Sequence, residues 1–517
     1  MLIRNILIVL LFLCIFVNVA GLQLKEKYSS INNQNHLSLT SLESSSMLWS
    51  KTFGGKGSDI CWSLSKTQDR GYIIIGETTS FDYKGGDAWL IKLDAEGNEE
   101  WNHTYGGSRG DYGLDGVETK DGGYVLVGGT KTYNVGDHDT WLIKTDVFGN
   151  EIWNKSYGGV NRDQGYRVIQ VADGGFVICG GSGSFSEGPN DYWIIKIDAE
   201  GNEIWNITYG GLGADWGYDV IEGINNELYF TGGTDTSLDH THILDIGLVQ
   251  LDKNGQIIWE KTFNKPPEKQ RWDEGYSVIK TNDKGFLIAG IAHTYHWGED
   301  GQGDGWIIKT DEKGDMIWNR IFGGDLCDGL STVKQTLDGG YVLAGWTYSY
   351  GGGDADIWLL KIDSMGYVEW DITLGGEEWE WSMLHTLELT DDDCFLIAGT
   401  TNSFGAGGSD VYLAKIKKPA LDISFQDGFG FSFQVNNNGD VDFTDLDWTI
   451  NISNVVLFGN SFEGSIDSLP TGGVITIDHQ GLMIGFGSGC VRMAIGNIGK
   501  TIHCLFIGPL VLKMYKL

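Results

Sequence analysis

Basic residues are the first shortage in this sequence. The 517 residues include 36 lysines and arginines against 70 aspartates and glutamates, which gives a formal net charge of −34. Contacts to nucleic acid phosphates depend on Lys and Arg, so this balance excludes a nucleic acid partner. A strongly acidic surface suits a soluble protein in a cation-rich extracellular setting.

Proline is also scarce, with six residues against 77 glycines. Glycine must therefore supply most of the turns. The chain is 41% hydrophobic and 12% aromatic, so apolar surface for a core is ample. Together these values describe turn-dense β structure.

The seven cysteines are too few and too scattered to form a disulfide framework. Four of them fall in different parts of the chain and are predicted to be buried thiols: Cys61, Cys179, Cys327 and Cys394. Cys490 and Cys504 flank a turn-like Gly-Asn-Ile-Gly sequence, and a hairpin centred on Asn497 would place them opposite each other. This geometry predicts a disulfide. A register slip of one residue would instead leave two small buried side chains.

Only one long apolar run is present, over residues 2–19. Small residues follow it at Val19-Ala20-Gly21, which predicts a secretory signal peptide over 1–21. The alternative is an uncleaved membrane anchor, because the run approaches the roughly 20 residues of a spanning helix. No second transmembrane segment is expected. Residues 22–46 are expected to form a disordered linker.

What the sequence does contain is a repeat marked by tryptophan, at spacings of 52 to 59 residues. The seven markers are Trp49, Trp101, Trp153, Trp205, Trp259, Trp318 and Trp370. Each copy has short β-branched and aromatic runs separated by Asp-Gly-Gly, a glycine-rich loop and Asp-x-x-Gly-Asn, which indicates four strands and no helix. We therefore expect an all-β fold with a seven-bladed β-propeller over 47–418.

The two ends of the array complement each other. The seventh copy lacks its fourth strand, because Lys417-Lys418-Pro419 replaces the turn and the tryptophan segment. Residues 47–53 carry the fourth-strand motif with no three strands before them. The amino-terminal strand is therefore predicted to close the ring as the outer strand of the last blade, which removes exposed sheet ends.

Two segments carry a resemblance to a known family. Leu93 to Trp101 and Ile197 to Trp205 resemble the Asp-x-x-x-Gly-x-x-x-Trp motif of quinoprotein-type (PQQ-like) propeller repeats. The whole unit is similar to the glycine-rich propellers of secreted prokaryotic surface proteins. The resemblance covers Met47 to Lys418 and implies the fold, but it carries no catalytic residue onto this chain. That family typically has eight copies and an adjacent cysteine pair, which argues against a quinoprotein enzyme.

Residues 419–517 drop the repeat. Alternating runs such as Asp447-Trp-Thr-Ile-Asn-Ile and Val474-Ile-Thr-Ile are separated by turn sequences. They predict a small Ig-like β-sandwich, similar to adhesion-type modules of surface proteins.

Length variation between copies falls on one face of the expected propeller, in the loops of blades four and five. Binding residues tend to be placed on loops held by a rigid scaffold. Aromatic side chains beside carboxylates suit sugar rings, and the histidines could also approach a metal ligand set. The candidate ligand-binding residues are His240, His242, Trp272, His293, His296, Trp297 and Asp300. The alternative is that these loops vary in length and sequence without binding any ligand.

One acidic residue per copy opens the innermost strand: Asp59, Asp111, Asp163, Asp215, Asp273, Asp328 and Glu380. Seven carboxylates around one end of a ring could hold a cation such as Ca²⁺, because hard cations take oxygen ligands. The favoured interpretation is that each carboxylate satisfies backbone groups of a turn.

Four Asn-x-Ser/Thr sequons begin at Asn102, Asn154, Asn206 and Asn451 and predict N-glycosylation. Three of them could instead reflect copying of the repeat. Taken together, the sequence predicts a secreted or cell-surface protein that binds an extracellular glycan or protein, without enzymatic activity or a cofactor. The alternatives are a quinoprotein-type or other extracellular propeller enzyme, and a purely structural surface-layer component.

Overall fold

The structure is a computed structural model that describes residues 46–81, 85–134, 136–235, 244–264, 272–293, 303–426, 428–429, 431–439, 443–453, 456–458, 461–479, 484–495, 498–508 and 510–513. Every regular element in these ranges is a β-strand. The predicted signal peptide and nearly all of the predicted linker lie outside the described residues. No helix within the described ranges is long and apolar enough to cross a membrane.

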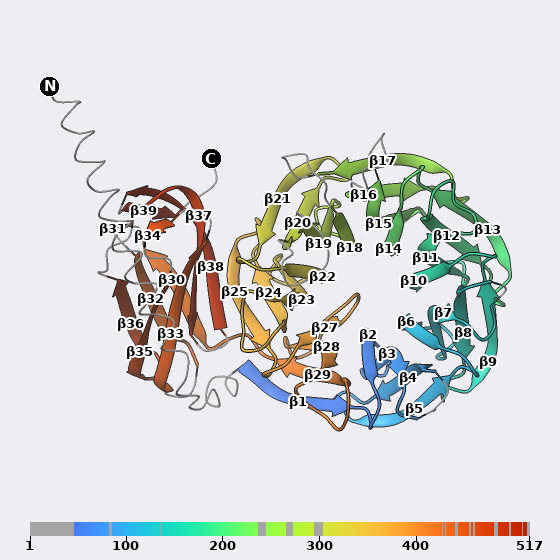
Figure 1. Cartoon of the computed structure of the whole chain (residues 1–517), viewed down its shortest axis with the longest axis horizontal. Helices are drawn as coiled ribbons and strands as arrows, with labels where there is room; N and C mark the ends of the chain where they lie inside the picture. The colour runs from blue at the N-terminus through green and yellow to red at the C-terminus, as the bar shows by residue number, and fades with distance from the viewer. Residues whose placement is uncertain are drawn as a thin grey trace, which may run out of the picture. The chain divides into compact units, whose positions relative to one another are not determined.

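Successive antiparallel four-stranded units make up most of the chain, and their innermost strands surround a common axis (Figure 1). Sheets one to three consist of β2 (Asp59–Lys66), β3 (Tyr72–Thr78), β4 (Asp87–Leu93) and β5 (Glu99–Tyr105); β6 (Asp111–Glu118), β7 (Tyr124–Thr130), β8 (Asp139–Thr145) and β9 (Glu151–Tyr157); and β10 (Asp163–Gln170), β11 (Phe176–Ser182), β12 (Asp191–Ile197) and β13 (Glu203–Tyr209).

Sheets four to six repeat the same order. They consist of β14 (Trp216–Glu222), β15 (Leu228–Asp235), β16 (Leu244–Leu251) and β17 (Ile257–Phe263); β18 (Asp273–Lys280), β19 (Phe286–His293), β20 (Gly303–Thr310) and β21 (Met316–Phe322); and β22 (Asp328–Gln335), β23 (Tyr341–Thr347), β24 (Asp356–Ile362) and β25 (Val368–Leu374). This arrangement of repeated sheets fits a β-propeller.

The closing sheet joins the two ends of the array. It contains β1 (Met47–Phe53), β26 (Glu380–Trp381), β27 (Leu387–Leu389), β28 (Phe395–Thr401) and β29 (Asp410–Ile416). The predicted closure is confirmed, because β1 pairs antiparallel with β29 from Met47↔Ile416 to Phe53↔Val411.

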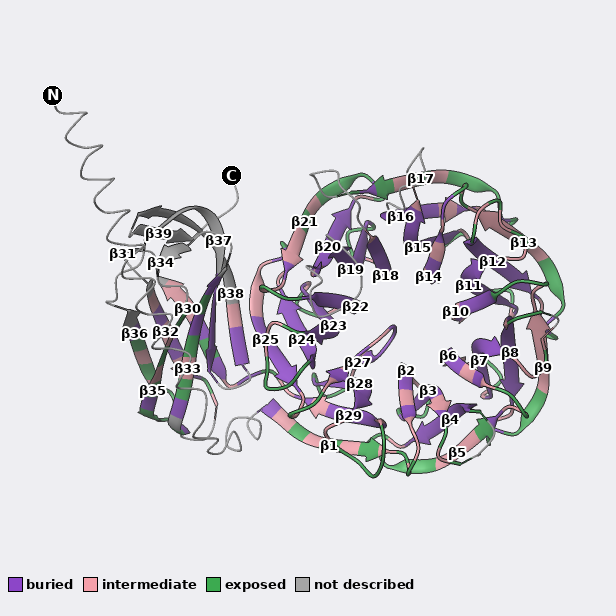
Figure 2. Ribbon diagram, viewed as in Figure 1, coloured by how far each residue is buried: buried purple, intermediate pink, exposed green. Residues whose placement is uncertain are grey.

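Burial within a sheet follows strand position. The second and third strands are buried on both faces, as in β7 and β8, because neighbouring sheets pack against each side. Figure 2 shows that the outer strands are partly exposed. One core cluster joins Ile73 and Leu90 of sheet one to Leu126 and Trp141 of sheet two. Each such aliphatic side chain contributes roughly 1.5–3 kcal/mol on burial.

The repeated tryptophan and the Asp-x-x-Gly-Asn turn are one packing unit. Asp94 Oδ1 accepts hydrogen bonds from the backbone N–H groups of Glu96 and Asn98, and Gly97 adopts φ 73°. A methyl group added to Gly97 would lie 2.4 Å from the ring of Trp49. Each tryptophan therefore covers the turn of the next copy, which requires glycine there and explains why both recur together.

The carboxyl-terminal strands form further sheets. They are β30 (Leu421–Gln426), β31 (Gly428–Phe429), β32 (Phe431–Asn437), β33 (Phe443–Ser453), β34 (Val456–Phe458), β35 (Ser461–Leu469), β36 (Val474–His479), β37 (Ile484–Ile495), β38 (Ile498–Gly508) and β39 (Leu510–Lys513). β30, β32 and β36 form one sheet, while β38 pairs with β25 through Asp371↔Gly499 and Ile372↔Ile498. Residues 44–517 form one compact unit.

The register of the hairpin that contains Cys490 and Cys504 differs from our expectation. Cys490 pairs with His503, and Cys504 pairs with Gly489. The hairpin centre therefore lies half a residue before Asn497, and the expected opposition of the two cysteines is wrong. A two-residue connection between Ile495 and Ile498 sets this register, because loop length fixes which residues face each other. The side chains of both cysteines lie outside the described residues.

Candidate functional site around the ring axis

The acidic residue at the start of each innermost strand anchors two loops. Asp111 accepts hydrogen bonds from the backbone N–H of Gly107, in the loop that leads into sheet two. It also accepts from Thr130 Oγ1, at the end of the second strand, and from Thr132 Oγ1, in the loop between the second and third strands. These two loops therefore meet at one end of the ring, which we call the insertion face, as the sequence predicted.

Five further members of the predicted acidic ring make the same kind of contact, to a glycine N–H before the strand and to a hydroxyl group at the end of the second strand: Asp59, Asp163, Asp215, Asp328 and Glu380. Asp273 occupies the matching position on β18. The bonds supply the turn-satisfying role that we favoured. In the described part of the chain, no group of three or more His, Cys, Asp or Glu side chains is placed to hold a metal ion.

The closing sheet breaks the pattern near the axis. From the acidic residue to the residue before the first turn there are eight positions in sheet one, from Asp59 to Thr67, but ten in the closing sheet, from Glu380 to Thr390. The two extra residues interrupt the innermost strand between β26 and β27. Leu384 is 3% exposed and has φ 48°, a left-handed conformation that is rare for a branched residue.

Neighbouring strands hold this inserted segment in place. The backbone carbonyl of His385 accepts a hydrogen bond from the N–H of Leu64 on β2. The carbonyl of Leu384 accepts from the hydroxyl of Thr332 on β22. Contacts on both sides thus hold Leu384 in its strained backbone conformation. Residues held in this way are often found at functional sites.

An axial cluster, defined as Asp115, Arg167, Asp219 and His385, spans the ring. Arg167 Nη1 lies 3.0 Å from Asp115 Oδ1, and Arg167 Nε lies 3.2 Å from Asp219 Oδ1. His385 Nε2 approaches the same Asp219 oxygen to 3.6 Å, although His385 belongs to the closing sheet and Asp219 to sheet four. Ser63 donates a hydrogen bond to Asp115. Charges and polar groups from five sheets therefore meet at the axis.

Burial dominates the protonation behaviour of the axial cluster. Desolvation raises the pKa of Asp219 to about 6, with Arg167 opposing the shift and the charge of Asp115 adding to it. Desolvation holds the pKa of His385 well below its usual range, and the cations Arg167 and Lys334 act in the same direction. His385 is therefore neutral at physiological pH.

An aromatic arc lies on the same strands, nearer the insertion face. Tyr166, Tyr218 and Tyr276 stand on the innermost strands of sheets three, four and five, and their ring centroids are 5.1 and 5.0 Å apart. Glu274 accepts hydrogen bonds from the hydroxyl groups of Tyr218 and Tyr276. Trp216 completes the arc, with its ring 6.3 Å from that of Tyr166. Tyr166, Tyr218 and Trp216 remain partly exposed to solvent.

Two of the predicted loop residues fall in the described ranges. Trp272 is partly exposed and forms a parallel bridge with Leu244, so it stands between sheets four and five at the insertion face. His293 ends β19 and pairs in register with Gly303. The remaining five predicted residues lie outside the described residues: His240, His242, His296, Trp297 and Asp300.

The sequon asparagines of the repeat take part in a packing contact that recurs from copy to copy. Asn154 Oδ1 accepts a hydrogen bond of 3.1 Å from Trp141 Nε1, and its Nδ2 donates to Glu151. Asn102 and Asn206 make the same two bonds. Asn319 accepts the same tryptophan bond without being part of a sequon. These asparagines therefore have a structural role that does not depend on glycosylation. Asn451 is exposed on β33 and accepts from Ser461.

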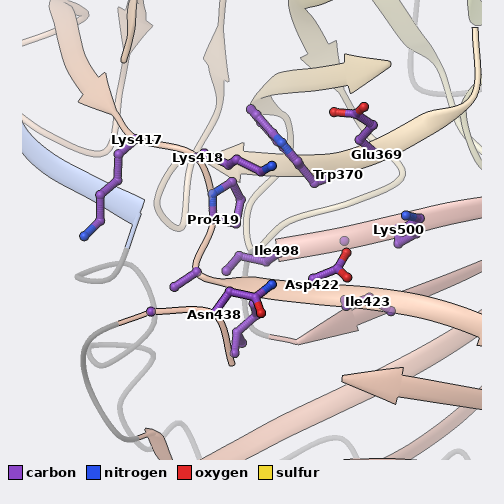
Figure 3. A pocket seen from close by; sticks show the side chains of 14 residues that line it. Glu369, Trp370, Lys417, Lys418, Pro419, Asp422, Ile423, Asn438, Ile498 and Lys500 are labelled. Carbon is purple, nitrogen blue, oxygen red and sulfur yellow. The ribbon is translucent and has the colours of Figure 1, made fainter. Parts of the chain in front are cut away.

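A separate cavity of about 780 Å³ lies beside the junction that follows β29 (Figure 3). Its lining includes Trp370, Lys418, Asp422, Asn438 and Lys500. In the other copies the equivalent tryptophan covers the next Asp-x-x-Gly-Asn turn, and here that turn is replaced by Lys417-Lys418-Pro419. The cavity is thus a consequence of the incomplete last repeat.

Comparisons with known proteins identify the fold alone. A scan against protein-family models finds no match. The regulatory protein FlaEY of Caulobacter vibrioides is 26% identical over 116 residues, which cover 20% of this chain and 12% of that protein. The chain therefore matches only a small part of that relative's length.

Similar solved structures include β-propeller proteins. The β-propeller domain of the Trilobed protease from Pyrococcus furiosus is 8% identical, with a TM-score of 0.38 over 70% of this chain and 94% of that one. The acylaminoacyl peptidase of Pyrococcus horikoshii is 9% identical, with a TM-score of 0.39 over 73% of this chain and 57% of that one. A Bacteroides caccae protein of unknown function is 12% identical, with a TM-score of 0.35 over 59% of this chain and 94% of that one.

The axial cluster and the aromatic arc were not among the residues that we predicted. The inserted pair in the closing sheet could have been found, because the ten-residue spacing from Glu380 to Thr390 stands out once the other copies are aligned. The contact between Arg167 and Asp219 could not have been predicted, because it depends on how the sheets are arranged around the axis.

Proposed function

We propose that this chain is a seven-bladed propeller with an Ig-like module over 419–517, exported to the cell surface or beyond, and that it binds an extracellular glycan at the insertion face. The observation that carries the proposal is the aromatic arc with Glu274 at its centre. Partly exposed aromatic rings provide the apolar face on which a sugar ring stacks, and the buried Glu274 holds two of these rings in place by accepting hydrogen bonds from their hydroxyl groups.

The position of the aromatic arc favours the insertion face as the binding face, as the elongated loops do. Tyr218 and Tyr276 belong to sheets four and five, and the elongated loops belong to those two sheets. Tyr218 lies three residues after Asp215, so the arc is roughly 10 Å from the insertion end of the strand at about 3.3 Å per residue. The elongated loops and the aromatic arc therefore lie in the same two sheets and near the same face, although they come from different parts of each repeat.

The proposal can be tested with a glycan array and the full-length secreted chain. The wild type is expected to bind a defined set of glycans, and the double variant Tyr218→Ala, Trp272→Ala is expected to lose at least tenfold in affinity for them. Phe148→Ala is the matched control, because Phe148 is 67% exposed in a third-to-fourth-strand turn at the other end of the ring. Equal loss in both variants, or no loss in the double variant, would contradict the proposal.

The same preparation separates the other candidates. A quinoprotein-type enzyme would carry a coloured bound quinone, so visible absorbance of the purified protein favours that alternative. A blank glycan array combined with capture of a defined cell-surface protein would show that the insertion face recognises protein. A structural surface-layer component would assemble into arrays without either ligand.

A further inference from the structure

Two carboxylates meet at the junction between sheets three and four. Asp191 begins β12, and Asp215 precedes β14. They are 2% and 0% exposed. A methyl group added to Gly210, in the loop between the sheets, would lie 2.6 Å from Asp215 Oδ2 and 2.8 Å from Asp191 Oδ1. Both oxygens thus face one point, which glycine leaves free of any side chain.

One of these oxygens has no partner in the described part of the chain. Asp191 Oδ2 accepts a hydrogen bond from the backbone N–H of Glu187, but Asp191 Oδ1 is buried with no hydrogen-bond donor. Asp215 differs, because Thr234 and the backbone N–H groups of Asp235 and Gly211 donate to it. Burying a carboxylate oxygen without a donor or a cation is costly.

Charge makes the arrangement less favourable still. Burial and the nearby charge of Asp215 raise the pKa of Asp191, and burial raises the pKa of Asp215. Two buried carboxylates whose oxygens face one point are stabilised by a proton on one of them or by a cation between them. Oxygen-only ligands of this kind are what Ca²⁺ prefers, with water or backbone oxygens completing its shell.

We propose that Asp191 and Asp215 bind a calcium ion at the junction of sheets three and four. This inference does not depend on the proposed glycan-binding function. The same geometry recurs at five other junctions, where a methyl group on the loop glycine would lie within 3.2 Å of an oxygen from each of two acidic residues: Gly54 with Asp410 and Asp59, Gly106 with Asp87 and Asp111, Gly158 with Asp139 and Asp163, Gly323 with Asp304 and Asp328, and Gly375 with Asp356 and Glu380.

Because the pair of carboxylates recurs at successive junctions, a cation at each junction would have a structural role. Each junction joins the third strand of one sheet to the first strand of the next, so a cation there would hold adjacent sheets together at the insertion face. The junction between sheets four and five has Asn264 where the others have glycine, so it is expected to bind differently. Calcium content should therefore reach several ions per chain, of which the Asp191 site contributes one.

The experiment measures calcium in the full-length protein by mass spectrometry of the metal after gel filtration in 1 mM CaCl₂ or 1 mM MgCl₂. Asp191→Asn is expected to lose about one Ca²⁺ per chain, and Mg²⁺ is expected to bind poorly. Asp198→Asn is the matched control, because Asp198 lies in an exposed turn of the same sheet and should retain the wild-type content. Thermal melting should shift upward by several degrees with Ca²⁺ and downward with a chelator.

A second variant keeps the test independent of folding defects in the first. Gly210 has no left-handed φ, so Gly210→Ala introduces no backbone strain but places its methyl group between the two oxygens. It should also lose about one Ca²⁺. Wild-type calcium content in both variants, or a wild type that binds no calcium and melts identically with and without chelator, would overturn the proposal and leave a shared proton between the carboxylates.

Discussion

His385 and Asp219 face each other across the ring axis, with 3.6 Å between His385 Nε2 and Asp219 Oδ1. They come from the closing sheet and from sheet four, which are separated by 166 residues of sequence. The contact exists only because the closing sheet carries two extra residues in its innermost strand. The two ends of the repeat array therefore contribute two features to the ring. β1 closes it, and the inserted segment brings His385 to the axis.

The protonation of Asp219 should be visible in stability. Its folded pKa of about 6 lies above the unfolded value near 3.9, so the ionised form opposes folding and that cost disappears as pH falls from about 6 toward 4. Asp219→Asn should therefore melt higher than the wild type at pH 8, and the difference should shrink as the pH falls below 6 and vanish near pH 4.

Melting curves at the two pH values provide the test. His385 contributes in the opposite direction, because its folded pKa lies below the unfolded value and its neutral form must be protonated at low pH. That contribution does not cancel, because His385 contacts Asp219, so both proteins are compared in a His385→Gln background. A difference between the two proteins that stays constant from pH 4 to pH 8 would contradict the shifted pKa of Asp219.

Removal of the amino-terminal strand should open the ring. Deleting residues 47–53 exposes the unpaired edge of β29 and removes the Trp49 ring that covers Gly97. We expect a lower melting temperature and rapid proteolysis near β29, because an unpaired strand edge is both less stable and more accessible. A deletion variant with unchanged melting and protease resistance would show that β1 contributes nothing to closure.

The buried ion pair between Asp371 and Arg492 should control how the carboxyl-terminal strands attach to sheet six. Arg492 is 7% exposed and also lies 4.2 Å from the ring centroid of Tyr350. Arg492→Ala leaves a buried carboxylate without its cation, which typically costs about 3–5 kcal/mol. Calorimetry should show a separate, earlier transition for the carboxyl-terminal strands.

A matched variant distinguishes charge from packing. Asp371 stands where other sheets have the asparagine that accepts from tryptophan, and Trp358 Nε1 has no hydrogen-bond partner among the described residues. Asp371→Asn combined with Arg492→Met should recover most of the lost stability, because it removes the buried charge left without a cation and keeps an acceptor oxygen beside Trp358. If the double variant is no more stable than Arg492→Ala, the ion pair is not what holds these strands.

The tryptophan and asparagine pair of the repeat offers a simpler stability test. Asn154→Ala removes the acceptor of Trp141 Nε1 and the donor to Glu151, so we expect a loss of about 1–3 kcal/mol in a denaturant titration. Asn451→Ala is the control, because Asn451 is exposed and outside this contact. Comparable losses in both variants would mean that the buried tryptophan bond adds no stability.

Strand content and ring closure could be predicted from the sequence because both depend on local signals. Turn residues at fixed offsets mark each strand, and the fourth-strand motif at Met47–Phe53 complements the missing strand after Ile416. The structural role of Asp111 followed from its repetition in every copy. The register at Cys490 did not follow, because a single residue of connection length moved it.

The sequence by itself determined the repeated four-stranded units, the glycine of each third-to-fourth turn and the strand that closes the ring, since hydrophobic alternation and backbone sterics act over a few residues. Only the tertiary structure decided that Asp191 meets Asp215, that Arg492 replaces a tryptophan as the partner of Asp371, and that His385 reaches Asp219. Those contacts join residues from different sheets, and their distances depend on how sheets pack around the axis, which no local pattern specifies.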